Sequence, residues 1–310
     1  MGDLLSILLH ISLPIMILIA VGYAYQKIFK SDIATFVRIQ MYVLVPAMVF
    51  NRVMHSEYTW ELVRSVTAYT ALLMIGLYII SRVYSAIARF PKSVRNANTN
   101  LMLLINTGNY GFPLIDLAFN GAPVATASQV LIVLYQNIVS STIGVFQASA
   151  GKASRKQAFL SIIKMPVLYA IVLAAVFRLT SVTIPDIVQI PLGYLDNAFV
   201  GVALLALGVQ LADVKLTRGL GRVFVTSAVK MISAPLLGFG IVLLLGIQGL
   251  LAQALIIGIA TPTALFAAMI AHEFDNEPGY TAQVIVVTTV LCTVTLPAVI
   301  YFVRQFFPYA

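Results

Sequence analysis

The sequence predicts an all-α membrane protein of ten transmembrane helices, arranged as two inverted five-helix repeats whose fourth and ninth helices are broken and cross. Composition is the first observation: 60% of the 310 residues are hydrophobic, 10% are charged, and the mean hydropathy is +0.97. Soluble globular domains carry about 25% charged residues, so a cytosolic enzyme, a secreted domain and a nucleic-acid-binding protein are excluded. The other two observations are ten apolar runs along the chain and helix-breaking residues at matching places in its two halves.

The ten apolar runs account for nearly all of the chain and leave no room for a domain outside the membrane. Each run is long enough to cross a hydrocarbon core of about 30 Å at about 1.5 Å per residue. The first run follows Asp3 without a basic leader, so we expect a mature helix there rather than a signal peptide. The predicted spans are residues 4–24, 34–54, 65–88, 98–119, 124–148, 160–179, 189–211, 223–247, 250–271 and 281–303.

Lysine and arginine residues indicate how these spans are oriented. Fifteen of the 19 lie in or beside the loops that follow spans one, three, five and seven, whereas Arg52, Arg64, Arg178 and Arg304 belong to the other side. Loops rich in Lys and Arg stay in the cytoplasm. The pattern therefore predicts a multi-pass protein of the cytoplasmic (plasma) membrane with both termini outside. The loop after span nine is acidic, but acidic residues weigh little in this rule.

The two halves of the chain resemble each other at one offset. Residues 14–26, PIMILIAVGYAYQ, align with residues 166–178, PVLYAIVLAAVFR, at a shift of 152 positions. This alignment pairs span one with span six and divides the chain into a first repeat, residues 1–150, and a second repeat, residues 151–310. An odd number of spans in each half inserts the halves in opposite orientations, as in the inverted repeats of secondary transporters.

Span four is interrupted near its middle. Residues 106–114 read NTGNYGFPL, so two glycines and Pro113 fall where the helix would otherwise be continuous. Glycine costs about 1 kcal/mol and proline about 3 kcal/mol inside a helix, and freed backbone groups in lipid cost several kcal/mol more. One interpretation is a kinked helix whose polar groups are satisfied by its neighbours. The other is an unwound crossover that lines a substrate cavity.

Span nine carries its own interruption, near the position that the offset assigns to Pro113. Residues 258–264 read GIATPTA, and Thr261 before Pro262 is typical of a helix N-cap followed by the first helical residue. We therefore expect new half-helices to begin at Pro262 and at about Pro113. Their N-termini would present unpaired N–H groups and about half a positive charge each, which together attract an anion.

Three charged residues are predicted at or near membrane depth. Lys230 lies inside span eight, where it either snorkels to the interface or pairs with a fixed charge, or else acts near an anionic substrate. Asp116 and Asp196, expected near the outer ends of their spans, are candidates for proton or cation coupling. Interfacial hydration or pairing with a helix dipole is the alternative for both carboxylates.

Span five carries a polar patch that includes Gln136 and Asn137, and Asn51 near the end of span two is similar. These side chains either hydrogen-bond between helices or line the crossover. The three histidines have no metal-ligand spacing, and the single Cys292 excludes a disulfide within the chain and a cysteine-based metal cage. No H-E-x-x-H motif, G-x-S-x-G motif or pair of midplane aspartates is present. We therefore expect no enzyme activity, no cofactor and no metal.

The crossover segment 106–114 also carries a family resemblance. It is similar to the N-x-G-x-x-G-x-P-L crossover of the auxin efflux carrier family, which includes the plant PIN-type carriers and ten-span bacterial permeases. The resemblance to the bacterial members covers essentially the whole chain, including Pro46, Lys230, Pro235 and Pro262. It implies an inverted repeat, crossed broken helices in spans four and nine, a scaffold of spans one, two, six and seven, and a transport unit of the other six spans. Bile-acid sodium symporters share this plan.

Two departures separate the chain from the plant carriers. Those carriers have N-P-N-T-Y at the first crossover, where this chain has Thr107 and Gly108, and they have a long central hydrophilic loop that is absent here. The resemblance therefore does not imply auxin itself as the substrate. Members of the family also handle malonate, malate and other organic anions. The resemblance implies a secondary active transporter of an organic carboxylate anion, of auxin-like, malonate or malate type, with elevator-type alternating access and the substrate at the crossover.

The predicted substrate site draws on both crossovers and on side chains beside them. Its residues are Asn106, Thr107, Gly108, Asn109, Tyr110, Pro113, Thr261, Pro262, Thr263, Gln136, Asn137 and Asn51, and the coupling or charge candidates are Lys230, Asp116 and Asp196. The expected partners are a small organic anion, the lipid bilayer, a proton if the cycle is proton-coupled, and a second copy of the chain if the protein is a homodimer.

Two alternatives remain at this stage. A membrane-embedded ligand sensor or channel would bind the same ligand without coupling its flux to anything. A sodium-coupled symporter would be favoured by carboxylate-rich cation cages at the midplane, and the sequence shows none.

Overall fold

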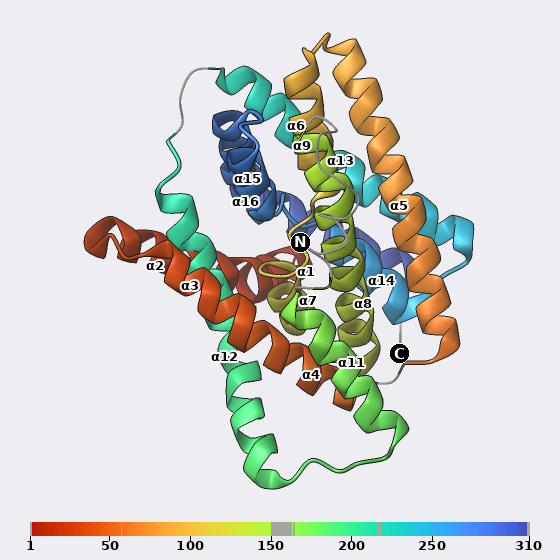
Figure 1. Ribbon diagram of the computed structural model, residues 1–310. Helices are drawn as coiled ribbons and strands as arrows, with labels where there is room; N and C mark the ends of the chain where they lie inside the picture. The colour runs from red at the N-terminus through yellow and green to blue at the C-terminus, as the bar shows by residue number, and fades with distance from the viewer. Residues whose placement is uncertain (1, 57, 150–162, 164, 216–218, 309–310) are drawn as a thin grey trace.

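The computed structural model describes residues 2–56, 58–149, 163, 165–215 and 219–308, and in these residues its regular elements are helices (Figure 1). Within this part of the chain, seven helical stretches are long and apolar enough to cross a membrane. This confirms the predicted class, an all-α membrane protein. Four of the seven are continuous α-helices, namely α5 (Trp60–Ile87), α12 (Asp186–Ala212), α13 (Leu220–Leu245) and α16 (Pro278–Phe306).

The other three long stretches are assembled from successive pieces. The first consists of α1 (Gly2–Ile7), η1 (Leu8–Ser12) and α2 (Leu13–Phe29). The second consists of α3 (Ile33–Ile39), η2 (Gln40–Leu44) and α4 (Val45–His55). The third consists of α8 (Pro123–Val139), η3 (Ser140–Gly144) and α9 (Val145–Ala148).

The remaining predicted spans are shorter or divided helices. α11 (Pro166–Leu179) covers most of the sixth span, whose predicted start at residue 160 lies outside the described residues. Span four consists of α6 (Lys92–Leu103) and α7 (Gly111–Phe119), and span nine consists of α14 (Gly249–Ile259) and α15 (Phe266–Glu273). Both predicted interruptions are therefore present. The arrangement of the whole chain as two inverted five-helix repeats stays a prediction.

One predicted helix start is wrong. α7 begins at Gly111, close to the expected Pro113, but α15 begins at Phe266 rather than at Pro262. Thr261 does not cap α15, because its Oγ1 donates to the carbonyl oxygen of Gly258, at 3.2 Å, near the end of α14. α14 ends at Ile259 and residues 260–265 are non-helical, so the prediction that the Thr-Pro pattern starts a helix was wrong.

The π-helical segments η1 and η2 have a local cause in proline. Pro14 and Pro46 stand at the second positions of α2 and α4, the α-helices that directly follow η1 and η2. A proline ring clashes with the carbonyl group four residues earlier, and a wider π-turn accommodates it. Gln40 and Met41, which belong to η2, are thereby placed beside the helix crossing described below.

Two groups of helices pack more closely within themselves than with each other. The first helix group is α2, α4, α11 and α12; the second helix group is α5, α6, α8, α13, α14 and α16, together with the half-helices α7 and α15. The helices of the first group are those of spans one, two, six and seven, and their role as a scaffold beside a moving transport unit stays a prediction. Both broken helices lie in the second helix group.

The helix ends gather at two opposite faces of the protein. We call the face that carries Lys27, Lys30, Lys92 and Arg222 the basic face; it includes the end of α2, the turn from α5 to α6 and the start of α13. The opposite face includes the ends of α4, α7, α11 and α16. In Figure 1 the α5–α6 turn lies at the top and the connection from α11 to α12 at the bottom.

Two glycines bring α2 and α12 into close contact at the centre of the first helix group. A Cβ atom on Gly22 would lie 2.1 Å from the carbonyl oxygen of Leu205, and one on Gly208 would lie 2.0 Å from that of Ile19. Real Cβ atoms do not approach so closely, so the backbones can touch only because both positions lack a side chain. Small residues allow such close packing in membranes, where van der Waals contact replaces the hydrophobic effect between helices.

Gly208→Ala is expected to destabilise the protein by about 1–3 kcal/mol, because the added methyl group forces the two backbones apart. Gly201 on the same helix is a matched control, since nothing lies within 4 Å of a Cβ built there. Gly201→Ala should be neutral or stabilising by up to about 1 kcal/mol. Thermal unfolding in detergent measures both, and equal shifts for the two variants would contradict the close approach.

Candidate functional site

The two interrupted segments cross and hold each other by backbone hydrogen bonds. The N–H of Asn106 donates to the carbonyl oxygen of Pro262, and the N–H of Ala264 donates to that of Leu104, both at 2.8 Å. Between them Ile105 and Thr263 form an isolated antiparallel bridge. Backbone groups freed by one broken helix are thus satisfied by the other, which is how irregular backbone is tolerated at membrane depth.

The carbonyl end of α6 is capped by side chains from three other elements. A helix leaves its last four carbonyl groups without partners inside the helix. Here side chains from the second crossover, α13 and α8 donate to three of the carbonyl oxygens near that end: Thr263 Oγ1 to Leu101 at 2.9 Å, Lys230 Nζ to Met102 at 2.7 Å, and Gln136 Nε2 to Leu103 at 2.9 Å. The crossing is therefore fixed by the packing of α8 and α13 as well as by its own backbone.

Lys230 takes neither of the structural roles expected for it. Its side chain is fully buried, so it does not snorkel to an interface. Among the described residues the ion pairs are those of Arg52 with Asp116 and Asp196, so no fixed ion pair of Lys230 is present either. Its amine instead caps the negative end of the α6 dipole at the crossing.

Gln129 of α8 contacts both interruptions and was not found by sequence reasoning. This fully buried side chain donates from Nε2 to the carbonyl oxygen of Thr107. A Cβ on Gly111 would lie 2.5 Å from its Nε2, and a Cβ on Gly258 would lie 2.7 Å from its Oε1. Two glycines of the broken helices therefore make the space that Gln129 fills.

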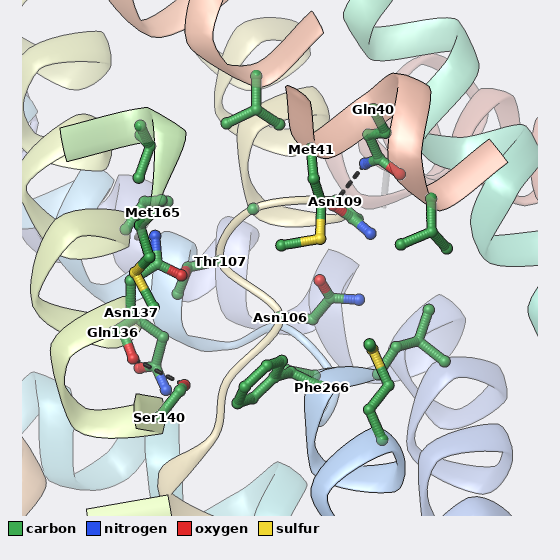
Figure 2. Close-up of a pocket in the computed structure, with 18 of the residues that line it drawn as sticks. Gln40, Met41, Asn106, Thr107, Asn109, Gln136, Asn137, Ser140, Met165 and Phe266 are labelled. Carbon is green, nitrogen blue, oxygen red and sulfur yellow. Dashed lines mark hydrogen bonds between the residues drawn. The ribbon is translucent and has the colours of Figure 1, made fainter. Parts of the chain in front are cut away.

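A cavity of about 180 Å³ lies between the crossing and the basic face (Figure 2). Its wall is formed by both crossovers and by α3, η2, α4, α8, η3, α11, α12 and α15. Both helix groups contribute to it, so the cavity lies at the boundary between them. Most lining side chains are apolar: Val37, Met41, Val45, Ile105, Val133, Met165, Pro166, Val167, Ala264, Leu265, Phe266 and Met269.

Most polar side chains of the cavity lie at the first crossover and along α8, and the others are Gln40 of η2 and Gln210 of α12. Figure 2 shows Asn106 beside the crossing, with Gln136, Asn137 and Ser140 on one side of it. Asn106 is 5% exposed and its Nδ2 has no hydrogen-bond partner in the part of the chain that the structure describes, so this amide is a buried donor directed at the cavity. The Oε1 of Gln136 is likewise an acceptor without a partner. Of the described residues that line the cavity, none carries a charge.

Asn109 is held by Gln40, the first residue of η2. Gln40, which is 3% exposed, donates from Nε2 to Asn109 Oδ1 at 2.6 Å (Figure 2). This bond leaves the Nδ2 of Asn109 free to donate. It also joins the first crossover to the stretch that contains α4, and Gln40 was not among the predicted site residues.

The remaining predicted site residues fall into two sets. Thr107 and Gly108 line the cavity, as do Asn106, Asn109, Gln136 and Asn137. The others do not line it: Tyr110, Thr261 and Thr263 are buried in the packing of the crossing, Pro113 lies inside α7, Pro262 contributes its carbonyl to the backbone pairing, and Asn51 lies in another cluster. Span nine instead presents Ala264, Leu265, Phe266 and Met269 to the cavity.

That other cluster joins three elements on the opposite side of the crossing. Arg52 of α4 pairs with Asp116 of α7 at 2.8 Å and with Asp196 of α12 at 2.9 Å. Asn51 donates to Asp196 at 2.7 Å and accepts from Gln189 at 2.8 Å. Asp196 was expected near the outer end of its span, but α12 begins at Asp186 and places this carboxylate well inside the helix.

Comparison with known protein families identifies the family of this chain. The family model described as "Membrane transport protein" matches residues 7–300, which is nearly the whole chain. The chain belongs to this membrane transport family. The match confirms the predicted resemblance to auxin efflux carriers, and it identifies the protein as a transporter rather than an enzyme.

Two archaeal relatives agree with this membership. A protein of Methanothermobacter thermautotrophicus described as an uncharacterized transporter is 24% identical over 302 residues, which cover 92% of this chain and 95% of the relative. A second uncharacterized transporter, from Methanocaldococcus jannaschii, is 24% identical over 297 residues, which cover 91% and 94% of the two chains. The similarity extends along both proteins and is not limited to one motif.

Thr263→Val should lower the free energy of unfolding by about 0.5–1.5 kcal/mol, because it keeps the side-chain shape but removes the donor to Leu101. Thr295→Val is a matched control, since Thr295 bonds only to the carbonyl oxygen of Leu291 within α16. The control should change stability by no more than a few tenths of a kcal/mol. Unfolding in detergent compares the two, and a larger loss for Thr295→Val would contradict the role given to Thr263.

Proposed function

We propose that the protein is a secondary active transporter of an organic carboxylate anion, which binds in the cavity beside the helix crossing. The observation that carries this proposal is the Nδ2 group of Asn106, a buried donor that has no partner among the described residues and faces a cavity whose described lining residues carry no charge. An unpaired buried donor costs about 1–3 kcal/mol. A ligand with a strong acceptor, such as a carboxylate, would remove that cost.

The half-helices supply the field that an anion requires. Gly108 and Asn109, which precede α7, and Ala264 to Phe266, where α15 begins, all line the cavity. Each helix N-terminus carries about half a positive charge and N–H groups without partners inside the helix. Two such ends at one small cavity favour an anion, although no lysine or arginine is among the described residues of its wall.

The cavity favours a small acid with one carboxylate and an apolar body. Its volume of about 180 Å³ is below the roughly 300–1,000 Å³ of sites for drug-sized ligands. Most of its polar groups lie near the crossing and along α8, with Gln40 and Gln210 on the side of the first helix group, while most of the remaining lining side chains are apolar. A second carboxylate would have to lose its hydration against that apolar wall. Among the predicted substrate types, an auxin-like monocarboxylate therefore fits better than malonate or malate.

The transport cycle we propose is an elevator-type movement of the second helix group along the first. The cavity opens between the two groups on the side of the basic face, which the distribution of Lys and Arg assigns to the cytoplasm. In this arrangement both termini lie outside the plasma membrane, and the described conformation faces the cytoplasm. Movement of the crossing toward the opposite face would expose the same residues to the outside.

Charge movement in proteoliposomes on solid-supported membranes tests this function. Acetate, indole-3-acetate, malonate and malate would be applied with and without pH and sodium gradients, and labelled counterflow would follow any electroneutral exchange. A saturable signal for monocarboxylates is expected. A signal for dicarboxylates alone would contradict the proposed substrate class, and a strict sodium requirement would favour the sodium-coupled symporter. Binding without counterflow would favour the sensor or channel.

Asn106→Leu should weaken the apparent affinity for the transported acid about tenfold or more, because a hydrogen bond to a charged group is worth about 1.5–3 kcal/mol. Asn276→Leu is the matched control: Asn276 is 8% exposed and donates to the carbonyl oxygen of Ser93, away from the cavity. Concentration dependence of counterflow measures both variants. Equal affinities for wild type and Asn106→Leu would contradict the role given to Asn106.

Asn109→Ala should abolish transport while the protein stays folded, because it removes both the free amide donor and the tie to Gln40. Counterflow at saturating substrate measures the loss, and size-exclusion chromatography with thermal unfolding checks the fold. A variant that transports at the wild-type rate would show that the first crossover does not contact the substrate through this side chain.

A further inference from the structure

The ion-pair cluster on the opposite side of the crossing joins the two helix groups. Arg52 and Asp196 lie on α4 and α12 of the first helix group, whereas Asp116 lies on α7 of the second. The Arg52 guanidinium also lies over the ring of Phe112, 5.7 Å from its centroid, and Phe112 belongs to α7. A single arginine thus holds the half-helix that follows the first crossover.

The two carboxylates are held unequally. Asp196 accepts from Arg52 Nε at 2.9 Å and from Asn51 Nδ2 at 2.7 Å, and its side chain is 12% exposed. Asp116 accepts from Arg52 Nη1 at 2.8 Å, and its side chain is 33% exposed. The Arg52–Asp196 pair is therefore complete within the first helix group. Solvent reaches Asp116 more readily than Asp196, and Asp116 can separate from Arg52 while Arg52 stays paired with Asp196.

The charges of the cluster do not balance. One guanidinium faces two carboxylates, so the fully ionised cluster carries one net negative charge in a partly buried place. A proton on Asp116 would remove that excess charge and the ion pair together, leaving a neutral Arg52–Asp196 pair. The ionised cluster therefore ties the helix groups together, and the protonated cluster releases them.

We propose that Asp116 is a proton-binding site that operates a latch, and that its protonation from the opposite face frees the second helix group to move. The proposal rests on the relative movement of the two groups assumed in the proposed function. The bond that breaks is the Arg52 Nη1–Asp116 Oδ1 ion pair, and the bond that forms is O–H on the Asp116 carboxyl group. With the latch closed, the cavity stays open to the basic face.

Other titratable groups near α7 are engaged elsewhere. The elements packed on α7 include η1, α8, α12 and α14. Among their described side chains, His10 of η1 donates to the carbonyl oxygen of Ser6, Tyr135 of α8 bonds to Thr67, and α14 has no titratable residue. Arg304 of α16 donates to the carbonyl oxygen of Ala118 at 2.9 Å. Arg52 and Asp196 are thus the charged groups that pair around Asp116.

The rate at which a cysteine in the cavity is labelled reports whether the cavity is open to the basic face, and no substrate is needed for this measurement. The native Cys292 is fully buried, so Met41→Cys would supply an accessible thiol in the cavity wall. A membrane-impermeant thiol reagent would be applied to the basic face across a range of pH. Lys92→Cys, at an exposed position on the same face, corrects for the lower thiolate fraction at low pH.

The expected result has a defined sign. With Asp116 ionised at high pH, the latch is closed, the cavity is open and labelling of Met41→Cys is fast. Acidification should slow the corrected rate about fivefold or more, which is the lower range of allosteric couplings. Asp116→Asn should be slow at every pH, whereas Asp116→Glu should restore the pH dependence.

Asp186→Asn is the matched control, because it removes an exposed carboxylate at the start of α12, outside the cluster, and should keep the pH dependence. Asp196→Asn should move the pH response to lower pH, because protonation of Asp116 would then leave Arg52 without an anionic partner. A pH response that persists in Asp116→Asn would overturn the proposal, and so would a rate that no variant and no pH changes. Labelled counterflow on the same proteins separates failure of the latch proposal from failure of the proposed function. If only the latch proposal is wrong, the protein would still exchange its substrate.

Discussion

The constraint on which the structure depends is that two helices stop inside the membrane, where every freed backbone group must find a partner within the protein. The two interruptions meet this demand by pairing with each other through Asn106 and Ala264. Thr263, Lys230 and Gln136 then satisfy the carbonyl end of α6. These side chains come from elements far apart in the sequence, so the crossing forms only when the second helix group packs. The site lies where this pairing ends. There the side-chain amide of Asn106 has no hydrogen-bond partner among the described residues and faces the cavity.

Division into two helix groups gives that site access to water. Within the first group, Gly22 and Gly208 let α2 and α12 touch backbone to backbone. Between the groups, contact is made by apolar packing, by the Gln40–Asn109 bond on one side of the crossing and by the Arg52–Asp116 pair on the other. The first tie joins Gln40 of η2, which leads into α4, to Asn109 of the first crossover. The second joins Arg52 of α4 to Asp116 of α7, the half-helix that follows this crossover. Among the described residues, a movement of one group along the other would exchange these two polar ties, and both are positioned to respond to events at the crossing.

Sequence reasoning predicted the membrane class, the helical runs and both interruptions, because glycine, proline and asparagine act locally on helix geometry. It also placed Asn106, Asn109, Gln136 and Asn137 at the cavity, since they follow or flank the first break. It failed where the contact is long-range. Gln129 and Gln40 are single amides in apolar helices, and nothing in their local sequence shows that both reach the crossover. The meeting of Asp116 and Asp196 on Arg52 depends on three helices, and the helix start at Phe266 depends on how the second crossover pairs.

The central claim is that a carboxylate binds at the crossing through Asn106, between two half-helix N-termini. The most direct measurement is an experimental structure of the protein with a bromine-substituted form of the transported acid, located by the anomalous signal of the bromine. The account predicts a single bromine peak in the apolar part of the cavity, with the carboxylate within hydrogen-bond distance of Asn106 Nδ2. A bromine peak elsewhere in the protein, with the cavity holding only water, would contradict it.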